Sequence, residues 1–312
     1  MSARKSRAVS SLWVLALGLL AAPGARAGGA AWTDFRLPAV ALGELKADGP
    51  APDAVAEPAA QPSLVDQWKN SVEYAVLLKQ NGWKGWSYAS AGRHPEIEWV
   101  EAFENPASEY RLQCAKSYDL AWAAVEAAAR SRPGELAVVL DLDETVLLNL
   151  KFQQENVDVP FDPAKWDAWV RRQEAQAVPG AKEFLAKVRR LGPRVRLVFM
   201  SDRSSALDAF TAANMRALGL LEDADILLDK KDKADNKEVR RRCLTDGRDG
   251  TDERCKTYAP MTIVAKLGDS LRDHFEVYGR TAADATAGDA RWGTEEFVLP
   301  NPMYGQWARD YK

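Results

Sequence analysis

The chain has few of the residues that build zinc sites. It contains only three cysteines and two histidines among its 312 residues. The two histidines, His94 and His274, lie far apart in the sequence, and no group of cysteines and histidines has the spacing of a zinc motif. These absences argue against a zinc-binding module.

A strong net charge and internal repeats are also missing. The formal net charge is −3, because 42 lysines and arginines face 45 aspartates and glutamates. A general nucleic-acid binder would normally carry a strongly basic face, so we expect no nucleic-acid polymer among the partners. The rest of the composition, 46% hydrophobic and 28% charged, is ordinary for a globular protein with a sizeable core.

A long apolar run is absent as well. The apolar stretch at residues 12–22 is too short to span a bilayer comfortably. Small residues follow it at Ala25-Arg26-Ala27, as at a cleavage site. Three basic residues precede it: Arg4, Lys5 and Arg7. We therefore expect residues 1–27 to be a signal peptide, the protein to be periplasmic or secreted, and the mature chain to have no stable membrane anchor.

The mature chain divides by composition into an arm and a domain. Residues 28–63 are rich in alanine, proline and glycine and show little periodicity. This composition predicts a linker or a loosely ordered arm. Residues 64–312 would then form the folded domain.

If the protein is exported, its three cysteines meet an oxidising compartment in which disulfides can form. Cys243 and Cys255 flank a loop rich in aspartate, glycine and arginine, and we expect a disulfide to close that loop in an oxidising compartment. The alternative is two independent thiols. Cys114 falls in a predicted helix, where we expect a buried free thiol.

The chemistry of the chain is concentrated where an apolar strand ends in two acids. The run Val138-Val139-Leu140 predicts a buried strand, and Asp141, Asp143 and Thr145 follow it at intervals of two. Because the backbone turns where a strand ends, both acids can approach one point. Two neighbouring carboxylates repel unless a cation or a shared proton relieves them. The pattern therefore predicts either a metal site with a nucleophile or a structural turn capped by Thr145.

Two further strands end in polar residues. Residues 195–200 form an apolar strand that closes on Ser201-Asp202-Arg203. Residues 262–267 form another, which runs into Gly268-Asp269 with Asp273 close behind. Open α/β sheets bind ligands at the carboxyl ends of their strands, so we expect these side chains to meet.

Strands alternate with helices along the domain. A short strand is predicted at residues 226–228, whereas residues 152–162 look irregular. Helices are predicted at residues 64–80, 108–130, 166–173, 179–190, 205–218 and 237–243. This alternation predicts the α/β class with a doubly wound parallel sheet.

The order of the motifs resembles a known family. Asp-x-Asp-x-Thr, then a serine at a strand end, then a lysine, then Gly-Asp-x-x-x-Asp is similar to the haloacid dehalogenase superfamily of phosphohydrolases. Closer marks resemble class C acid phosphatases: Trp169-Val170, residues 177–184, residues 230–233, and Leu299-Pro300-Asn301-Pro302-Met303-Tyr304-Gly305-Gln306-Trp307. Within that class the pattern is most similar to the outer-membrane lipoprotein type, which acts as a 5′-nucleotidase. The resemblance covers residues 99–307 and implies a core with a small helical cap.

The resemblance implies a mechanism built on two aspartates. Asp141 would be the nucleophile and form an aspartyl-phosphate that water then hydrolyses. Asp143 would protonate the leaving alkoxide and later activate the water. Mg²⁺ would be the cofactor, bound by the side chains of Asp141 and Asp269 and by the backbone carbonyl of Asp143.

Other residues would stabilise charge and orient the site. Ser201 would hydrogen-bond a phosphoryl oxygen, and Lys237 would neutralise charge on the phosphate and the aspartate. Lys237 is preferred over the neighbouring lysines because its spacing to Arg240 matches the family's Lys-x-x-Arg. Asp273 would orient the metal site, the alternative being an exposed aspartate that caps a helix.

The resemblance also implies small phosphomonoester substrates. In lipoprotein-type relatives aromatic side chains sandwich the nucleoside base, and the matching positions here are Trp166 and Tyr304. Arg203 is a further expected substrate contact. Because stacking tolerates any base, we expect broad use of nucleoside 5′-monophosphates. Trp169, three residues from Trp166 on a helix, is expected to pack in the core.

Several alternatives stay open. Lipoprotein relatives carry a cysteine directly after the signal, whereas the first cysteine here is Cys114, so acylation is not expected. A homodimer is a further expectation, since similar enzymes are commonly dimers. The competing functions are a non-catalytic, storage-type relative on the same scaffold, a phosphotransferase that passes phosphate to an alcohol, and a phosphoprotein phosphatase.

Overall fold

The computed structural model describes most of the predicted domain. It covers residues 64–86, 108–156, 159–275, 286–305 and 307, all within one compact unit, Ala59–Lys312. The predicted signal peptide at residues 1–27, the arm at residues 28–63 and His94 lie outside the described residues.

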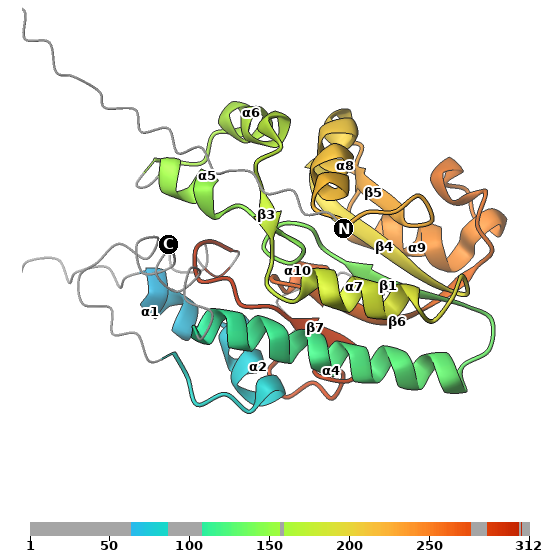
Figure 1. The fold of residues 1–312 in the computed structure, drawn as a ribbon, viewed down its shortest axis with the longest axis horizontal. Helices are drawn as coiled ribbons and strands as arrows, with labels where there is room; N and C mark the ends of the chain where they lie inside the picture. Colours follow the sequence, from blue (N-terminus) through green and yellow to red (C-terminus); the bar gives the residue numbers. More distant parts are fainter. Residues whose placement is uncertain (1–63, 87–107, 157–158, 276–285, 306, 308–312) are drawn as a thin grey trace, which may run out of the picture. The chain divides into compact units, whose positions relative to one another are not determined.

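The domain is built on a five-stranded parallel sheet (Figure 1). Its order is β5-β4-β1-β6-β7, and every neighbouring pair runs parallel. The strands are β1 (Glu135–Leu140), β4 (Val195–Ser204), β5 (Ile226–Lys230), β6 (Met261–Gly268) and β7 (Glu296–Val298). This architecture confirms the predicted doubly wound α/β fold.

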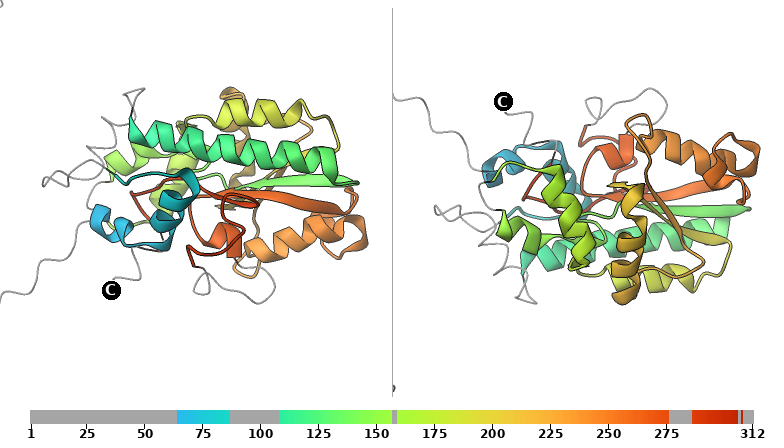
Figure 2. Two further views of the ribbon diagram at one scale, coloured as in Figure 1. Left: turned by 90° about the horizontal axis from the view of Figure 1, so that it is seen from below. Right: turned by 90° about the horizontal axis from the view of Figure 1, so that it is seen from above.

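Helices cover both faces of the sheet (Figure 2). Seen edge-on, the sheet lies between one layer that contains α4 (Glu109–Ser131) and α7 (Ala181–Arg189) and another that contains α9 (Lys237–Asp246) and α10 (Arg272–Phe275). Alternate side chains of β1 enter different cores, because successive residues of a strand point to opposite faces. Val138 packs in the cluster shared with α4 and α7, and Val139 packs in the cluster shared with α9.

A small cap follows the first core strand. Two short antiparallel strands, β2 (Leu147–Leu148) and β3 (Gln176–Ala177), form its base. Between them lie α5 (Leu150–Glu155) and α6 (Pro163–Arg172), which stand together above β3 in Figure 1. Asp162 caps α6 through its side chain, and a proline occupies the first turn.

Two helix predictions were wrong at identifiable points. The stretch at residues 152–162 looked irregular, but its first residues belong to α5 (Leu150–Glu155), whose Phe152 packs against Trp166 and Trp169. The helix predicted at residues 64–80 is two helices, α1 (Leu64–Lys69) and α2 (Val72–Asn81). The break falls at Ser71, whose hydroxyl accepts a hydrogen bond from the Tyr74 amide and starts α2.

The remaining elements lie close to their predicted positions. The segment predicted as a helix at residues 205–218 is a 3₁₀ turn (Ser205–Leu207) followed by α8 (Asp208–Ala217). Two further 3₁₀ turns, Gly247–Asp249 and Glu253–Cys255, occupy the loop after α9. That loop is closed by a disulfide between Cys243 and Cys255, with Cα atoms 5.6 Å apart, while Cys114 is a buried free thiol.

The helices of the described residues were compared with the length and apolarity that a membrane span requires. None of them meets both conditions.

Candidate active site

Three buried carboxylates meet at the carboxyl edge of the sheet. Asp141 follows β1 and Asp269 follows β6, and these strands are neighbours. Asp273 comes from α10, just beyond. Each offers a carboxylate oxygen within 4.8 Å of the others, and all three side chains are buried. The parallel sheet therefore gathers acids that lie far apart in the sequence.

The turn after β1 is tight and strained. The Asp141 amide continues the sheet by donating to the Leu267 carbonyl at 2.9 Å, and the Leu142 carbonyl then accepts from the Leu147 amide at 2.7 Å. Glu144 adopts the left-handed conformation, with φ 56°, which is uncommon for a residue with a side chain. The hydroxyl of Thr145 has no hydrogen-bond partner among the described residues, so it does not cap this turn.

Lys237 reaches two of the carboxylates. It begins α9, where the side chain of Asn236 caps the helix, and its Nζ lies 2.5 Å from Oδ1 of Asp141 and of Asp273. Burial acts to lower the pKa of Lys237, but the surrounding carboxylates outweigh it and raise the pKa above its ordinary value. The lysine therefore stays charged beside Asp141.

The charges of this cluster suit a divalent cation. With all four groups ionised, three carboxylates and one ammonium leave two negative charges. Burial, together with the neighbouring acids, opposes this ionisation by raising the pKa of Asp141 and of Asp269, and a cation would offset that cost. Oδ2 of Asp141 and Oδ1 of Asp269 accept no hydrogen bond from the described residues. Oxygen ligands of this kind are those that hard divalent cations prefer. The residues present thus fit a divalent metal.

Asp273 is engaged through both of its oxygens. Oδ1 accepts from Lys237, and Oδ2 accepts from the Ser270 amide at 3.0 Å. A Cβ added to Gly268 would lie 2.2 Å from Oδ2 of Asp273, so only glycine permits this close approach. Asp273 is buried rather than an exposed helix cap.

Asp143 lies beside the cluster and is held by an arginine. Its side chain is 19% exposed, whereas that of Arg203 is 1% exposed. Arg203 donates to Oδ1 of Asp143 from Nη2 at 2.7 Å and from Nε at 3.0 Å. The guanidinium also lies 5.5 Å from the ring centroid of Trp166. These contacts direct Arg203 toward Asp143, and its contact with substrate stays a prediction.

Ser201 and Arg240 fix the strand next to β1. The Ser201 hydroxyl is fully buried and accepts from the Arg203 amide at 3.1 Å. Arg240, also fully buried, donates to the Ser201 carbonyl and pairs with Asp202 at 2.6 Å. The arginine of the Lys-x-x-Arg pattern thus joins α9 to β4.

The two predicted base-stacking rings lie on separate segments. Trp166, on α6, is half-buried and meets the ring of Phe152 edge-on, with centroids 5.1 Å apart. Tyr304 is also half-buried, and its amide lies 3.5 Å from Oδ1 of Asn301. No ring contact joins Trp166 to Tyr304 in the part of the chain that the structure describes.

Two asparagines at the site were missed from the sequence. Asn301 donates to Oδ2 of Asp269 at 2.8 Å and accepts from the Met303 amide, which ties the segment before Tyr304 to the carboxylate cluster. Asn149 donates to Oδ1 of Asp143 at 2.9 Å. Asn301 lies within a motif that the resemblance singled out, whereas nothing local marks Asn149.

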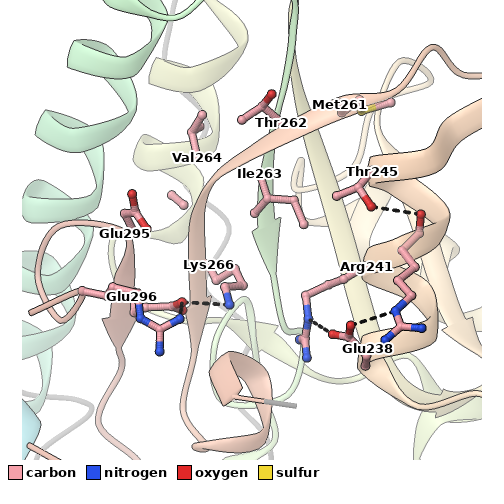
Figure 3. Close-up of a pocket in the computed structure, with 13 residues that line it drawn as sticks. Glu238, Arg241, Thr245, Met261, Thr262, Ile263, Val264, Lys266, Glu295 and Glu296 are labelled. Atoms are coloured by element: carbon pink, nitrogen blue, oxygen red, sulfur yellow. Dashed lines mark hydrogen bonds and ion pairs between the residues drawn. The ribbon is translucent and has the colours of Figure 1, made fainter. Parts of the chain in front are cut away.

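A cavity of about 550 Å³ lies elsewhere, between α9, β6 and the segment before β7 (Figure 3). Charged side chains in its wall pair with each other: Glu238 with Arg242 at 3.0 Å, and Lys266 with Glu296 at 2.8 Å. None of the clustered aspartates is among its lining residues. This cavity is therefore distinct from the carboxylate cluster.

Comparison with known proteins identifies the family. The family model described as HAD superfamily, subfamily IIIB (Acid phosphatase) matches residues 81–307. The structure is similar to that of the class C acid phosphatase from Bacillus anthracis, with 28% identity over 70% of this chain and 89% of that one and a TM-score of 0.57. It is also similar to a crystal structure of the class C acid phosphatase from Bacillus anthracis with tungstate bound, with 28% identity over 70% of this chain and 91% of that one and a TM-score of 0.55. The chain belongs to the acid phosphatase subfamily, IIIB, of the HAD superfamily and is a phosphomonoester hydrolase, as the motif order predicted.

Proposed function

We propose that this protein is an exported, Mg²⁺-dependent acid phosphatase that hydrolyses nucleoside 5′-monophosphates through an aspartyl-phosphate. The observation that carries the proposal is the buried Asp141 beside Lys237, with Asp269 and Asp273 within 4.8 Å. Family membership supports phosphomonoester hydrolysis, and the following steps supply its chemistry.

Asp141 is the proposed nucleophile. Its carboxylate attacks phosphorus, the aspartyl oxygen–phosphorus bond forms, and the bond to the ester oxygen breaks. Asp143 gives its proton to the departing alkoxide. Water then attacks phosphorus, Asp143 takes a proton from it, and the Asp141 carboxylate is released. Lys237 offsets negative charge on Asp141 and on the phosphoryl group throughout.

Mg²⁺ is the proposed metal. The side chains of Asp141 and Asp269 and the backbone carbonyl of Asp143 would hold it, and when bound it supplies positive charge that screens the phosphate. Asp273, whose oxygens are occupied by Lys237 and Ser270, orients the lysine and does not serve as a ligand. Ser201 is proposed to donate to a phosphoryl oxygen. The binding of tungstate, a phosphate-like oxyanion, by the similar Bacillus anthracis enzyme supports an oxyanion site here.

Nucleoside recognition is proposed to come from Trp166 and Tyr304. Both side chains are half-buried. The Trp166 ring lies 5.5 Å from the guanidinium of Arg203, which binds Asp143, and Tyr304 follows Asn301, which binds Asp269. These contacts support the proposal. Stacking between aromatic rings accepts purines and pyrimidines alike, so the substrate range would be broad.

The proposed export rests on two independent features. The first 27 residues have the pattern of a signal peptide. The disulfide between Cys243 and Cys255 supports an oxidising compartment, where such bonds persist. The boundary of the arm at residues 28–63 and a homodimer stay predictions.

Phosphate release from a panel of substrates tests this function. The panel contains nucleoside 5′-monophosphates and an aryl phosphate, each assayed with Mg²⁺ and with EDTA, and Asp141→Asn is the inactive control. We expect metal-dependent release that favours the nucleotides. Release from the aryl phosphate alone would refute the base-binding role of Trp166 and Tyr304. Release by Asp141→Asn at the wild-type rate would refute the mechanism.

A further inference from the structure

Asn149 occupies the first position before α5, yet its side chain does not cap that helix. Asparagine is among the most favoured residues at a helix N-cap, where its side chain normally accepts from a backbone amide two or three residues on. Here no such bond forms, and the side chain is fully buried. It turns instead toward Asp143.

Every hydrogen-bonding position of the Asn149 amide is used. Nδ2 donates to Oδ1 of Asp143 at 2.9 Å and to Oε2 of Glu144 at 3.3 Å. Oδ1 accepts from Nε1 of Trp169 at 2.8 Å and from Nη2 of Arg203 at 3.3 Å. Indole and guanidinium groups only donate, so the amide oxygen must face them and the amide nitrogen must face the carboxylates. The partners therefore fix the orientation of the amide.

This arrangement distinguishes the two oxygens of Asp143. Oδ1 receives Asn149 and two nitrogens of Arg203, whereas Oδ2 receives only Nε of Arg203 at 3.2 Å. Oδ1 therefore has its acceptor positions filled, whereas Oδ2 keeps room for a further hydrogen bond and can face the leaving group or water.

Trp169 links this network to the cap. It lies on α6, the helix that also carries Trp166, and it is 2% exposed. Core packing accounts for its ring, but packing alone does not require its N–H to meet Asn149. The hydrogen bond from Trp169 to Asn149, at 2.8 Å, therefore connects α6 to Asp143 through the Asn149 side chain.

We propose that Asn149, held by the indole N–H of Trp169, is a positioning residue for Asp143 and couples the cap helix α6 to protonation of the leaving group. The proposal rests on the proposed role of Asp143 as the acid of the phosphatase reaction. Replacing Asn149 or Trp169 should leave Asp143 in place but wrongly oriented. Hydrolysis should then slow for substrates whose leaving group needs a proton and stay nearly unchanged for substrates whose leaving group does not.

The test compares two substrates that both lack a nucleoside base. Glycerol phosphate leaves as an alkoxide and needs a proton, whereas p-nitrophenyl phosphate leaves as a stable phenolate. We expect Asn149→Ala and Trp169→Phe each to lower kcat/KM for glycerol phosphate about 10- to 100-fold. The value for p-nitrophenyl phosphate should change less than about threefold. Because glycerol phosphate has no ring that could stack on Trp166, loss of base binding cannot produce the expected loss of activity on this substrate.

Trp292→Phe is the matched control. Trp292 is also buried and also donates its indole N–H to a protein acceptor, the Thr286 carbonyl at 2.9 Å, but it lies outside this network. We expect it to keep the wild-type ratio of the two kcat/KM values. If circular dichroism shows that Asn149→Ala does not fold, the ratio of the two kcat/KM values for Trp169→Phe tests the proposal.

Equal losses on both substrates, or no loss in a folded variant, would overturn the positioning role. A wild-type enzyme that releases phosphate neither from these two substrates nor from nucleoside 5′-monophosphates would instead contradict the proposed function, so the two failures are distinguishable.

Discussion

Lys237 differs from the other lysines of its cluster in what it touches. Its ammonium contacts Asp141 and Asp273, whereas Lys230 lies 3.9 Å from Asp202 and Lys231 lies 3.7 Å from Asp252. Lys233 is exposed. Spacing to an arginine favoured Lys237 from the sequence, and burial gives the physical reason, because a charge taken out of water needs charged partners.

Replacing Lys237 should remove charge stabilisation at the nucleophile. We expect Lys237→Met to lower kcat about 100- to 1,000-fold, because Asp141 loses the ammonium that lies 2.5 Å from its carboxylate and would offset charge during phosphoryl transfer. Lys231→Met, an exposed neighbour, is the control and should keep wild-type kinetics. Urea unfolding of both variants separates loss of catalysis from loss of fold. Similar activities for the two folded variants would contradict the role of Lys237.

The aspartates that meet at the sheet edge could be predicted from the sequence, but the asparagines that hydrogen-bond to the aspartates could not. Asp141 and Asp269 could be predicted because each follows a strand directly, and strand ends in a parallel sheet converge. Asn149 and Asn301 act through partners that only the folded chain brings near, and Asn149 in particular carries no local signal. The same holds for the N–H of Trp169, whose ring pattern predicts packing alone.

Among the helices and strands, short elements such as β7 and α5 were not predicted from the sequence. β7 has three residues and α5 has six, too few for a hydrophobic period to show. Both are held by contacts with distant segments: β7 pairs with β6, and α5 packs on α6 through Phe152. By contrast, α4 has 23 residues with a sustained apolar period, and β1 is a continuous apolar run, so both were predicted to within a few residues.

Gln80 of α2 closes the edge of the sheet at β7. Its amide nitrogen donates to the Val298 carbonyl at 3.2 Å, and its amide oxygen accepts from the Val298 amide at 3.0 Å. The side-chain amide of Gln80 thus pairs with this edge as a neighbouring strand would, and the Ser117 hydroxyl donates a further hydrogen bond to the Val298 carbonyl at 2.8 Å. Because β7 leads to Asn301, this contact also supports the segment that reaches Asp269.

Gln80→Ala should therefore destabilise the domain. We expect a loss of about 2 kcal/mol in the free energy of unfolding, since two hydrogen bonds are lost and the buried Val298 amide stays unpaired, whereas the Val298 carbonyl keeps the hydrogen bond from the Ser117 hydroxyl. Urea denaturation measures this loss. Gln154→Ala, at an exposed position of α5, is the control and should change stability by less than about 0.5 kcal/mol. Equal stabilities would show that the edge contact is dispensable.

At the scale of the whole molecule, a buried acid pair predicts how stability depends on pH. Asp229 at the end of β5 is 3% exposed, and the neighbouring carboxyl of Asp208 acts on it electrostatically. Burial, and then the neighbouring Asp208, raise the pKa of Asp229 to about 9. The native protein therefore keeps a proton that the unfolded chain loses above about pH 4.

The sign of the effect follows from this difference in proton binding. Between about pH 4 and about pH 9 the native state binds more protons than the unfolded state, so stability falls as the pH rises through this window. The cost is at most about 1.4 kcal/mol for each pH unit crossed. Asp229→Asn should flatten this decline, measured as the midpoint of thermal unfolding at pH 5 and pH 8. Asp223→Asn, whose side chain is fully exposed, should keep the wild-type slope. Parallel slopes for all three proteins would contradict the assignment.

The most direct test asks whether phosphate is ever bonded to Asp141. The reaction with a phosphomonoester is quenched in acid during turnover and the protein is digested. The masses of its peptides are then measured by mass spectrometry. We expect the mass of one phosphoryl group on the peptide that contains Asp141, lost on treatment with hydroxylamine and absent from Asp141→Asn. Rapid phosphate release with no adduct on that peptide, or with an adduct on another residue, would contradict the account.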